Sequence, residues 1–135
     1  MSIFNWEEFN LGLEIASIDN QHKELFAIIN KLYDIAESDD IFNDLKKVIK
    51  ELHDYTEYHF STEIEYLIKF DYPKIDEHKK LHKAFTDEIA KYEELAAENK
   101  LKPADCANIF NYLVKWLTMH IDKVDRDYAT FIKKL

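Results

Sequence analysis

Residues 59–82, HFSTEIEYLIKFDYPKIDEHKKLH, are the stretch from which the fold of this chain can be worked out. His59 and Glu63 lie four residues apart, and after the DYP break His78 and His82 do so as well. Residues four apart share one face of an α-helix, about 40° from perfect alignment. Two antiparallel helices joined at this break would therefore aim four metal-binding side chains at one point between them.

The composition favours a few long helices. The chain has 135 residues, of which 47% are apolar, with one Gly and two Pro. It can therefore bury a core, but it lacks the turn residues that a sheet protein needs. The net charge of −9 argues against a nucleic-acid partner, which would require a basic surface.

The N-terminus has no basic segment followed by an apolar run, and no apolar stretch approaches the length of a bilayer. We therefore expect no signal peptide, no membrane contact and a cytoplasmic location. Cys106 is the single cysteine and cannot form an internal disulfide, so we expect a small buried apolar residue there.

Apolar residues at spacings of three and four predict four amphipathic helices, over residues 19–37, 41–69, 74–98 and 103–121. Helices of similar length with short connections are typical of an antiparallel up-down bundle. We expect an all-α four-helix bundle that forms one domain over residues 1–135, with a short final helix.

The N-terminal segment, residues 1–17, has a mixed pattern that predicts an irregular arm packed across the bundle. Gly12 is expected to mark a bend in this arm, and Asp19 to cap the first long helix. Pro73 and Pro103 are each expected at the first position of the following helix, where a missing N–H is tolerated.

Polar residues continue the apolar spacing on all four helices, so they should point into the core. These residues are His22, His59, Glu63, His78, His82 and His120. A buried polar group without a partner costs ~1–3 kcal/mol, so the set would cost about as much as the whole ~5–15 kcal/mol stability of a domain. A single such histidine is more often a hydrogen-bonded core residue than a ligand. All six, however, fall at one end of an up-down bundle, which indicates a shared metal site.

His53 serves as an internal comparison. It lies six residues before His59, about 120° round the helix, and is expected off the ligand face.

Imidazole and carboxylate donors suit iron, manganese or zinc and disfavour copper(I). The number of donors exceeds the needs of one ion, which favours two ions bridged by carboxylates. The Glu-x-x-His repeat of carboxylate-rich bundles is absent from the sequence.

These residues resemble the hemerythrin family, in particular its bacterial single-domain members. The resemblance covers nearly the whole chain: Trp6, the IDNQHKELF run around His22, HFSTE, the Tyr-Pro turn, HKKLH and the closing WLTMHIDKVDRDY. It implies two non-heme iron ions with an oxo or hydroxo bridge. One iron would be held by His78, His82 and His120, the other by His22 and His59, with Glu63 and Asp125 bridging them.

Asp125 is assigned by resemblance alone. It lies five residues after His120, about 140° away on an ideal helix, so we expect a kink, a bulge or a helix end to rotate it back. The resemblance also implies that Tyr128 donates a hydrogen bond to a bridging carboxylate. An apolar pocket would surround the two-His iron, although each of its residues fits a plain core as well: Leu25, Phe60, Trp116, Leu117 and Ile121.

The implied function is reversible binding of dioxygen for storage, transport or delivery, without enzymatic turnover. One alternative is sensing of oxygen, redox state or nitric oxide through changed contacts with a separate protein partner. Another is a diiron enzyme that turns over or detoxifies peroxide or nitric oxide. A purely structural bundle is disfavoured by the cost of the buried polar groups.

Overall fold

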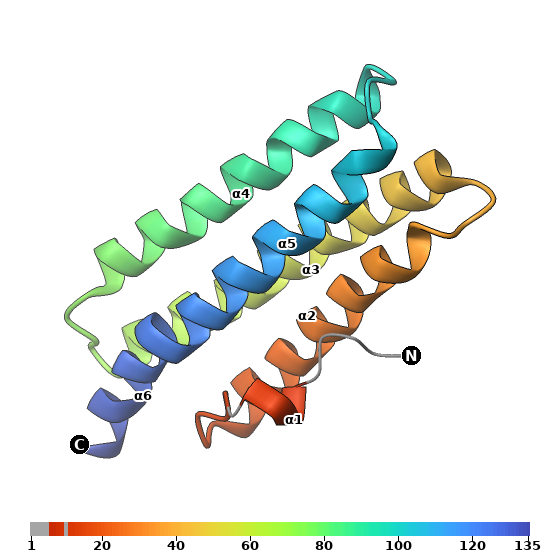
Figure 1. Cartoon of the computed structure of the whole chain (residues 1–135). Coiled ribbons are helices and arrows are strands. Elements are labelled where there is room, and N and C mark those ends of the chain that lie inside the picture. Colours follow the sequence, from red (N-terminus) through yellow and green to blue (C-terminus); the bar gives the residue numbers. More distant parts are fainter. Residues whose placement is uncertain (1–5, 10) are drawn as a thin grey trace.

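The computed structural model of the chain describes residues 6–9 and 11–135, and every regular element within them is a helix. The four long helices are α2 (Ala16–Ile35), α3 (Ile41–Lys69), α4 (Ile75–Ala97) and α5 (Pro103–Met119). They run side by side and alternate in direction (Figure 1). The predicted antiparallel four-helix bundle is thus confirmed. None of the described helices combines the length and the apolar character that crossing a lipid bilayer requires.

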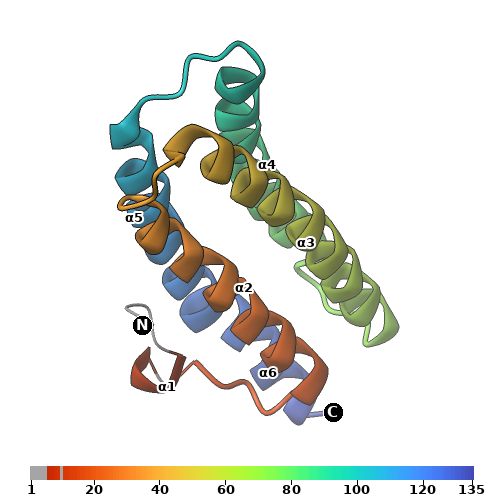
Figure 2. The same cartoon turned by 90° about the vertical axis from the view of Figure 1, so that its right-hand side faces the viewer.

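The bundle forms because each long helix buries one apolar stripe. On α2 this stripe includes Ile18, Leu25 and Ile29, and on α5 it includes Ile109 and Leu113. The backbones of α2 and α3, α3 and α4, and α2 and α5 pack closely, whereas those of α4 and α5 approach one another less closely. Figure 2 shows the same bundle from another side, with α6 beside the start of α2 and α1 at the edge of the bundle.

Two smaller elements follow α5 directly. A π-helix spans His120–Asp125, and α6 spans Arg126–Lys133, which confirms the predicted short C-terminal helix. The side chains of Tyr128 and Ala129 on α6 are buried against the bundle. The ends of α5 and α6 therefore lie beside the starts of α2 and α4.

The predicted positions of the two prolines have different outcomes. Pro103 occupies the first position of α5, as expected. Pro73 lies in the loop, because Asp71 adopts a left-handed φ of 53° and the Tyr72 amide donates to the Leu67 carbonyl at 3.0 Å. These contacts close α3, and the chain then needs two more residues before α4 begins at Ile75.

The N-terminal arm differs from the prediction in its details. Trp6–Phe9 forms a single helical turn, α1, and residues 1–5 and 10 of the arm lie outside the described residues. α2 begins at Ala16, three residues earlier than predicted, so Asp19 lies within its first turn.

Asp19 therefore stabilises the loop that precedes α2 and is not the N-cap of this helix. Its carboxylate accepts hydrogen bonds from the Leu13 and Glu14 amides at 2.9 and 3.1 Å. The bend that we expected at Gly12 lies at Glu14, which takes a left-handed conformation with a φ of 63°. The bend is held by the carboxylate, and it does not need the freedom of glycine at that position.

Candidate metal centre

The predicted site residues converge at one end of the bundle. The starts of α2 and α4 and the ends of α3 and α5 meet there (Figure 1). All seven proposed ligands are at most 5% exposed: His22, His59, Glu63, His78, His82, His120 and Asp125. His53, in contrast, is exposed, and its Nδ1 lies 2.9 Å from Glu93 Oε1 on the surface, away from the cluster.

Glu63 is shared by two groups of donors, and each group is compact enough to hold one ion. Glu63 Oε1 lies 2.5 Å from Nε2 of His78 and 2.9 Å from Nε2 of His82. Its other oxygen, Oε2, lies 3.4 Å from Nε2 of His59 and 3.7 Å from Nε2 of His22. One carboxylate oxygen therefore faces each group.

Asp125 repeats this arrangement from the opposite side. Its Oδ1 lies 3.1 Å from Nε2 of His120 and 3.2 Å from Nε2 of His78, while its Oδ2 lies 3.2 Å from Nε2 of His22. The π-helix makes this possible, because its hydrogen bonds join residues five apart and so bring residues 120 and 125 to one face. The expected bulge after His120 is confirmed.

The donor set fits metal ions better than it fits internal hydrogen bonds. Two ligand atoms that bind one ion at right angles, each about 2.1 Å away, lie about 3 Å apart. Most of the distances between imidazole nitrogens and carboxylate oxygens fall near this value. Within the described part of the chain, Nε2 of His22 and of His120 and both oxygens of Asp125 are buried without a hydrogen-bond partner. Coordination would satisfy these four atoms together.

The electrostatics also favour a cation. Burial lowers the pKa of His22, His78 and His120, but the adjacent carboxylates of Asp125 and Glu63 outweigh this and raise each pKa to about 9. Burial would raise the pKa of both carboxyl groups, yet the imidazoles hold it below its usual range. The carboxylates thus stay ionised and attract positive charge, which protons supply until metal ions displace them.

His82 differs from the other three imidazoles on this point. Burial lowers its pKa, and Glu63 does not fully reverse the effect because His78 and His120 add repulsion. Its ring is stacked on Phe60, with centroids 3.8 Å apart and planes 7° apart. A neutral, sterically fixed imidazole is the form that coordinates a metal.

The predicted pocket residues are mostly buried. Leu25, Phe60, Leu117 and Ile121 lie in the core, whereas Trp116 is half-buried. The Trp116 ring stacks on the His120 ring at 4.3 Å. That these five side chains surround a small ligand at the two-His group stays a prediction.

Two hydrogen bonds hold the ligands in position. The buried Tyr128 hydroxyl donates to Glu63 Oε2 at 3.2 Å, and burial together with the Glu63 charge raises the pKa of Tyr128, which keeps it a donor. Nδ1–H of His59 donates to Gln21 Oε1 at 2.7 Å, which leaves the Nε2 lone pair facing the carboxylates. Gln21 was missed from the sequence because it lies outside the apolar seam. Its only signal was its position beside His22.

A helical bundle that encloses five imidazoles and two shared carboxylates belongs to the class of bundles whose core side chains can hold metal ions. The comparison with known families agrees with this class. Residues 13–132 match the model of the hemerythrin HHE cation binding domain. The chain therefore belongs to the hemerythrin family.

The relatives span nearly the whole length of the chain. A bacteriohemerythrin of Clostridium acetobutylicum is 32% identical over 136 residues, covering 93% of this chain and 98% of that protein. A bacteriohemerythrin of Methylococcus capsulatus is 28% identical over 131 residues, covering 96% of each. Among solved structures, a wild-type hemerythrin superimposes with a TM-score of 0.84 at 25% identity, covering 95% of this chain and 96% of that one.

Proposed function

We propose that this protein binds dioxygen reversibly at a pair of non-heme iron ions, for storage, transport or delivery. The observation that carries the proposal is the shared pair of carboxylates. Glu63 and Asp125 each turn one oxygen towards the three-His group and the other towards the two-His group. This arrangement suits two bridged ions, because a single ion could not bind all of these donor atoms.

The donors are divided unequally between the two groups. His78, His82 and His120 with one oxygen from each carboxylate provide five donors, whereas His22 and His59 with the other two oxygens provide four. An ion in the two-His group therefore has one protein donor fewer, which gives a small external ligand a place to bind. When bound, an iron pair supplies the electrons for reversible attachment of dioxygen.

The remaining side chains hold this site and keep it dry. Gln21 fixes the tautomer of His59, and Tyr128 keeps one oxygen of Glu63 hydrogen-bonded. Apolar side chains exclude water from the site. Water would otherwise promote loss of the bound oxygen in a reduced form, which would leave the iron pair oxidised. We assign this role to Leu25, Phe60, Trp116, Leu117 and Ile121.

The test is metal content together with a reversible spectrum. We expect two iron ions per chain and an absorption band that appears under oxygen and disappears under argon over repeated cycles. One ion per chain, or a band that never reverses, would contradict the proposal.

We propose a binding protein and not an enzyme, because the buried polar side chains are already engaged. Besides the proposed ligands, the buried side chains with polar groups in the described residues include those of Gln21, Thr56 and Tyr128. Gln21 holds His59, and the Thr56 hydroxyl donates to the Leu52 carbonyl at 2.8 Å. The Tyr128 hydroxyl donates to Glu63, so each of these three polar groups already has a hydrogen-bond partner. Turnover of peroxide or nitric oxide much faster than autoxidation would overturn this part of the proposal.

A further inference from the structure

An apolar groove of about 440 Å³ opens on the outer face between α4 and α5. It exists because the backbones of these two helices are spaced more widely than the other neighbouring pairs. The Phe85 and Trp116 rings pack between these helices with centroids 4.5 Å apart, and Trp116 also lines the groove. The groove is lined by Leu81, Tyr112, Lys115, Trp116, Met119, His120, Lys123 and Val124.

The groove exposes large apolar side chains to solvent. Met119 is 64% exposed and Leu81 is 38% exposed, and both are large side chains on adjacent helices. Apolar side chains that cluster in this way at a surface groove mark a binding surface more often than chance exposure.

The floor of the groove leads directly to the candidate metal centre. His120 lines it, although this imidazole is only 5% exposed, and Trp116 is stacked against the same ring. A redox partner bound in the groove would contact the surface beside His120, which is itself one of the proposed ligands of the three-His group. The proposed oxygen position belongs to the other group, so reduction and oxygen binding would use opposite sides of the centre.

The charges at the groove differ in sign from the chain as a whole. The protein carries a net charge of −9, yet Lys115 and Lys123 flank the groove and no carboxylate is among the described residues that line it. Neither of these ammonium groups pairs with any residue that the structure describes. Unpaired lysines around an apolar surface suit an acidic partner with an apolar contact patch.

We propose that this groove is the docking site of an acidic one-electron carrier protein of the iron–sulfur or flavin class. The inference rests on the proposed function, because an iron pair that has autoxidised must be reduced before it binds oxygen again. Each encounter oxidises the carrier by one electron. Two encounters convert two Fe(III) to two Fe(II), and solvent supplies the proton that the bridging oxygen takes up.

A carrier fits the groove better than a second copy of this chain does. A symmetric contact between two copies would bring the lysines of both grooves into one interface, and both copies carry the same net charge. Electron-carrier encounters are also small, below about 1,200 Å² of total buried area, which a single groove can provide.

Docking can be measured without any iron chemistry. The zinc-substituted protein, which is redox-inert, is titrated with a plant-type [2Fe–2S] ferredoxin as the acidic probe, and amide NMR signals are followed across a salt series. We expect paramagnetic broadening centred on Leu81, Met119 and Val124, and affinity that falls as salt rises. A basic cytochrome serves as the opposite-charge probe and should leave these signals unchanged.

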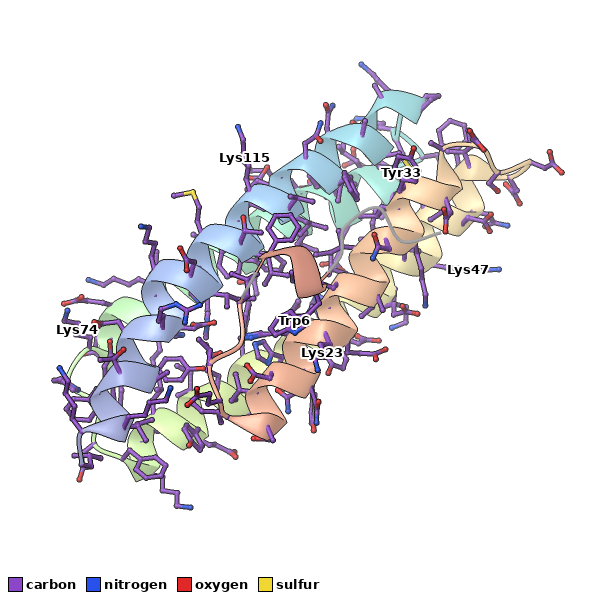
Figure 3. All side chains as sticks on the ribbon, turned by 60° about the horizontal axis from the view of Figure 1, so that its bottom comes forward. Trp6, Lys23, Tyr33, Lys47, Lys74 and Lys115 are labelled. Carbon is purple, nitrogen blue, oxygen red and sulfur yellow. The ribbon has the colours of Figure 1, made fainter. Side chains whose placement is uncertain are left out.

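The double variant Lys115→Glu/Lys123→Glu tests the charges, and Lys47→Glu/Lys134→Glu is the matched control. All four lysines are exposed, so the two variants change the net charge equally. Figure 3 shows Lys115 and Lys47 projecting from opposite sides of the bundle. We expect the groove variant to weaken ferredoxin binding by ~10-fold or more and the control by less than about twofold.

Several results would overturn the inference. Equal weakening by both variants would show only a general charge effect, and broadening centred elsewhere would place the partner on another face. Dimerisation of the wild-type chain that the groove variant abolishes would assign the groove to a second copy.

In the iron-loaded protein, ferredoxin should reduce the oxidised wild-type chain ~10-fold faster than the groove variant. If oxygen cycling is normal in both but these reduction rates are equal, the groove inference fails while the proposed function stands. If the wild type never cycles, the proposed function fails, and the zinc titration still decides the groove.

Discussion

Replacing Gln21 by Glu tests how the centre is tuned through His59. Gln21 Oε1 accepts a hydrogen bond from His59 Nδ1 at 2.7 Å, and the Gln21 side chain is only 9% exposed. A neutral hydrogen bond contributes about 0.5–1.5 kcal/mol and one to a charged group about 1.5–3 kcal/mol, so the change adds roughly 1–1.5 kcal/mol. The added negative charge favours the more positive, oxidised state of the metal pair. We therefore expect the reduction potential to fall by roughly 40–70 mV for a one-electron step.

The assay is a redox titration under argon, followed by the absorption of the oxidised protein. Asn20→Asp is the matched control, because it adds the same charge one residue earlier on α2, at an exposed position where water screens it. Gln21→Met keeps the length of the side chain and removes the hydrogen-bond acceptor of His59. We expect it to weaken metal binding by about 10–100-fold. Equal shifts in potential for Gln21→Glu and Asn20→Asp, or unchanged metal affinity in Gln21→Met, would refute this reasoning.

Three further predictions concern the ligands themselves. His78→Ala should lose metal and unfold at lower temperature, whereas His53→Ala should do neither; metal analysis and thermal unfolding check both, and equal effects would mean that the ligand face is misassigned. Tyr128→Phe should cost about 1–3 kcal/mol of stability in urea unfolding, because a buried oxygen of Glu63 loses its donor; no loss would exclude the hydrogen bond. The metal-free protein should lose stability towards urea as the pH rises from about 6.5 to 9. Folding raises the pKa of three imidazoles to about 9, so their protonation stabilises the folded state fully only below pH 6.5. An increase in stability over that pH range would contradict this prediction.

The sequence was sufficient for the helices and for the face that each one buries. This is because the spacing of Leu25, Ile29, Leu113 and similar residues is a local property of each helix, and burial follows directly from it. The helix ends were less predictable. Asp19 has the chemistry of an N-cap, but it satisfies the amides of a preceding loop whose path depends on the rest of the bundle. Pro73 has the chemistry of a first helical residue, but the left-handed Asp71 fixes where α4 can begin.

Asp125 shows where helical periodicity reaches its limit. Ideal spacing places it about 140° from His120, so no count of seam positions would select it. A residue-level resemblance assigned it, and the π-helix of His120–Asp125 supplies the physical reason. A π-turn disrupts regular helical hydrogen bonding and is found mostly at functional sites. Here the disruption brings a second carboxylate within 3.2 Å of imidazoles from three different segments, at His22, His78 and His120. On a regular helix Asp125 would point about 140° away from His120 and could not share these imidazoles, whereas in the π-turn its buried carboxylate has three of them nearby. The five-residue spacing of His120 and Asp125 therefore becomes a shared face only through the π-turn.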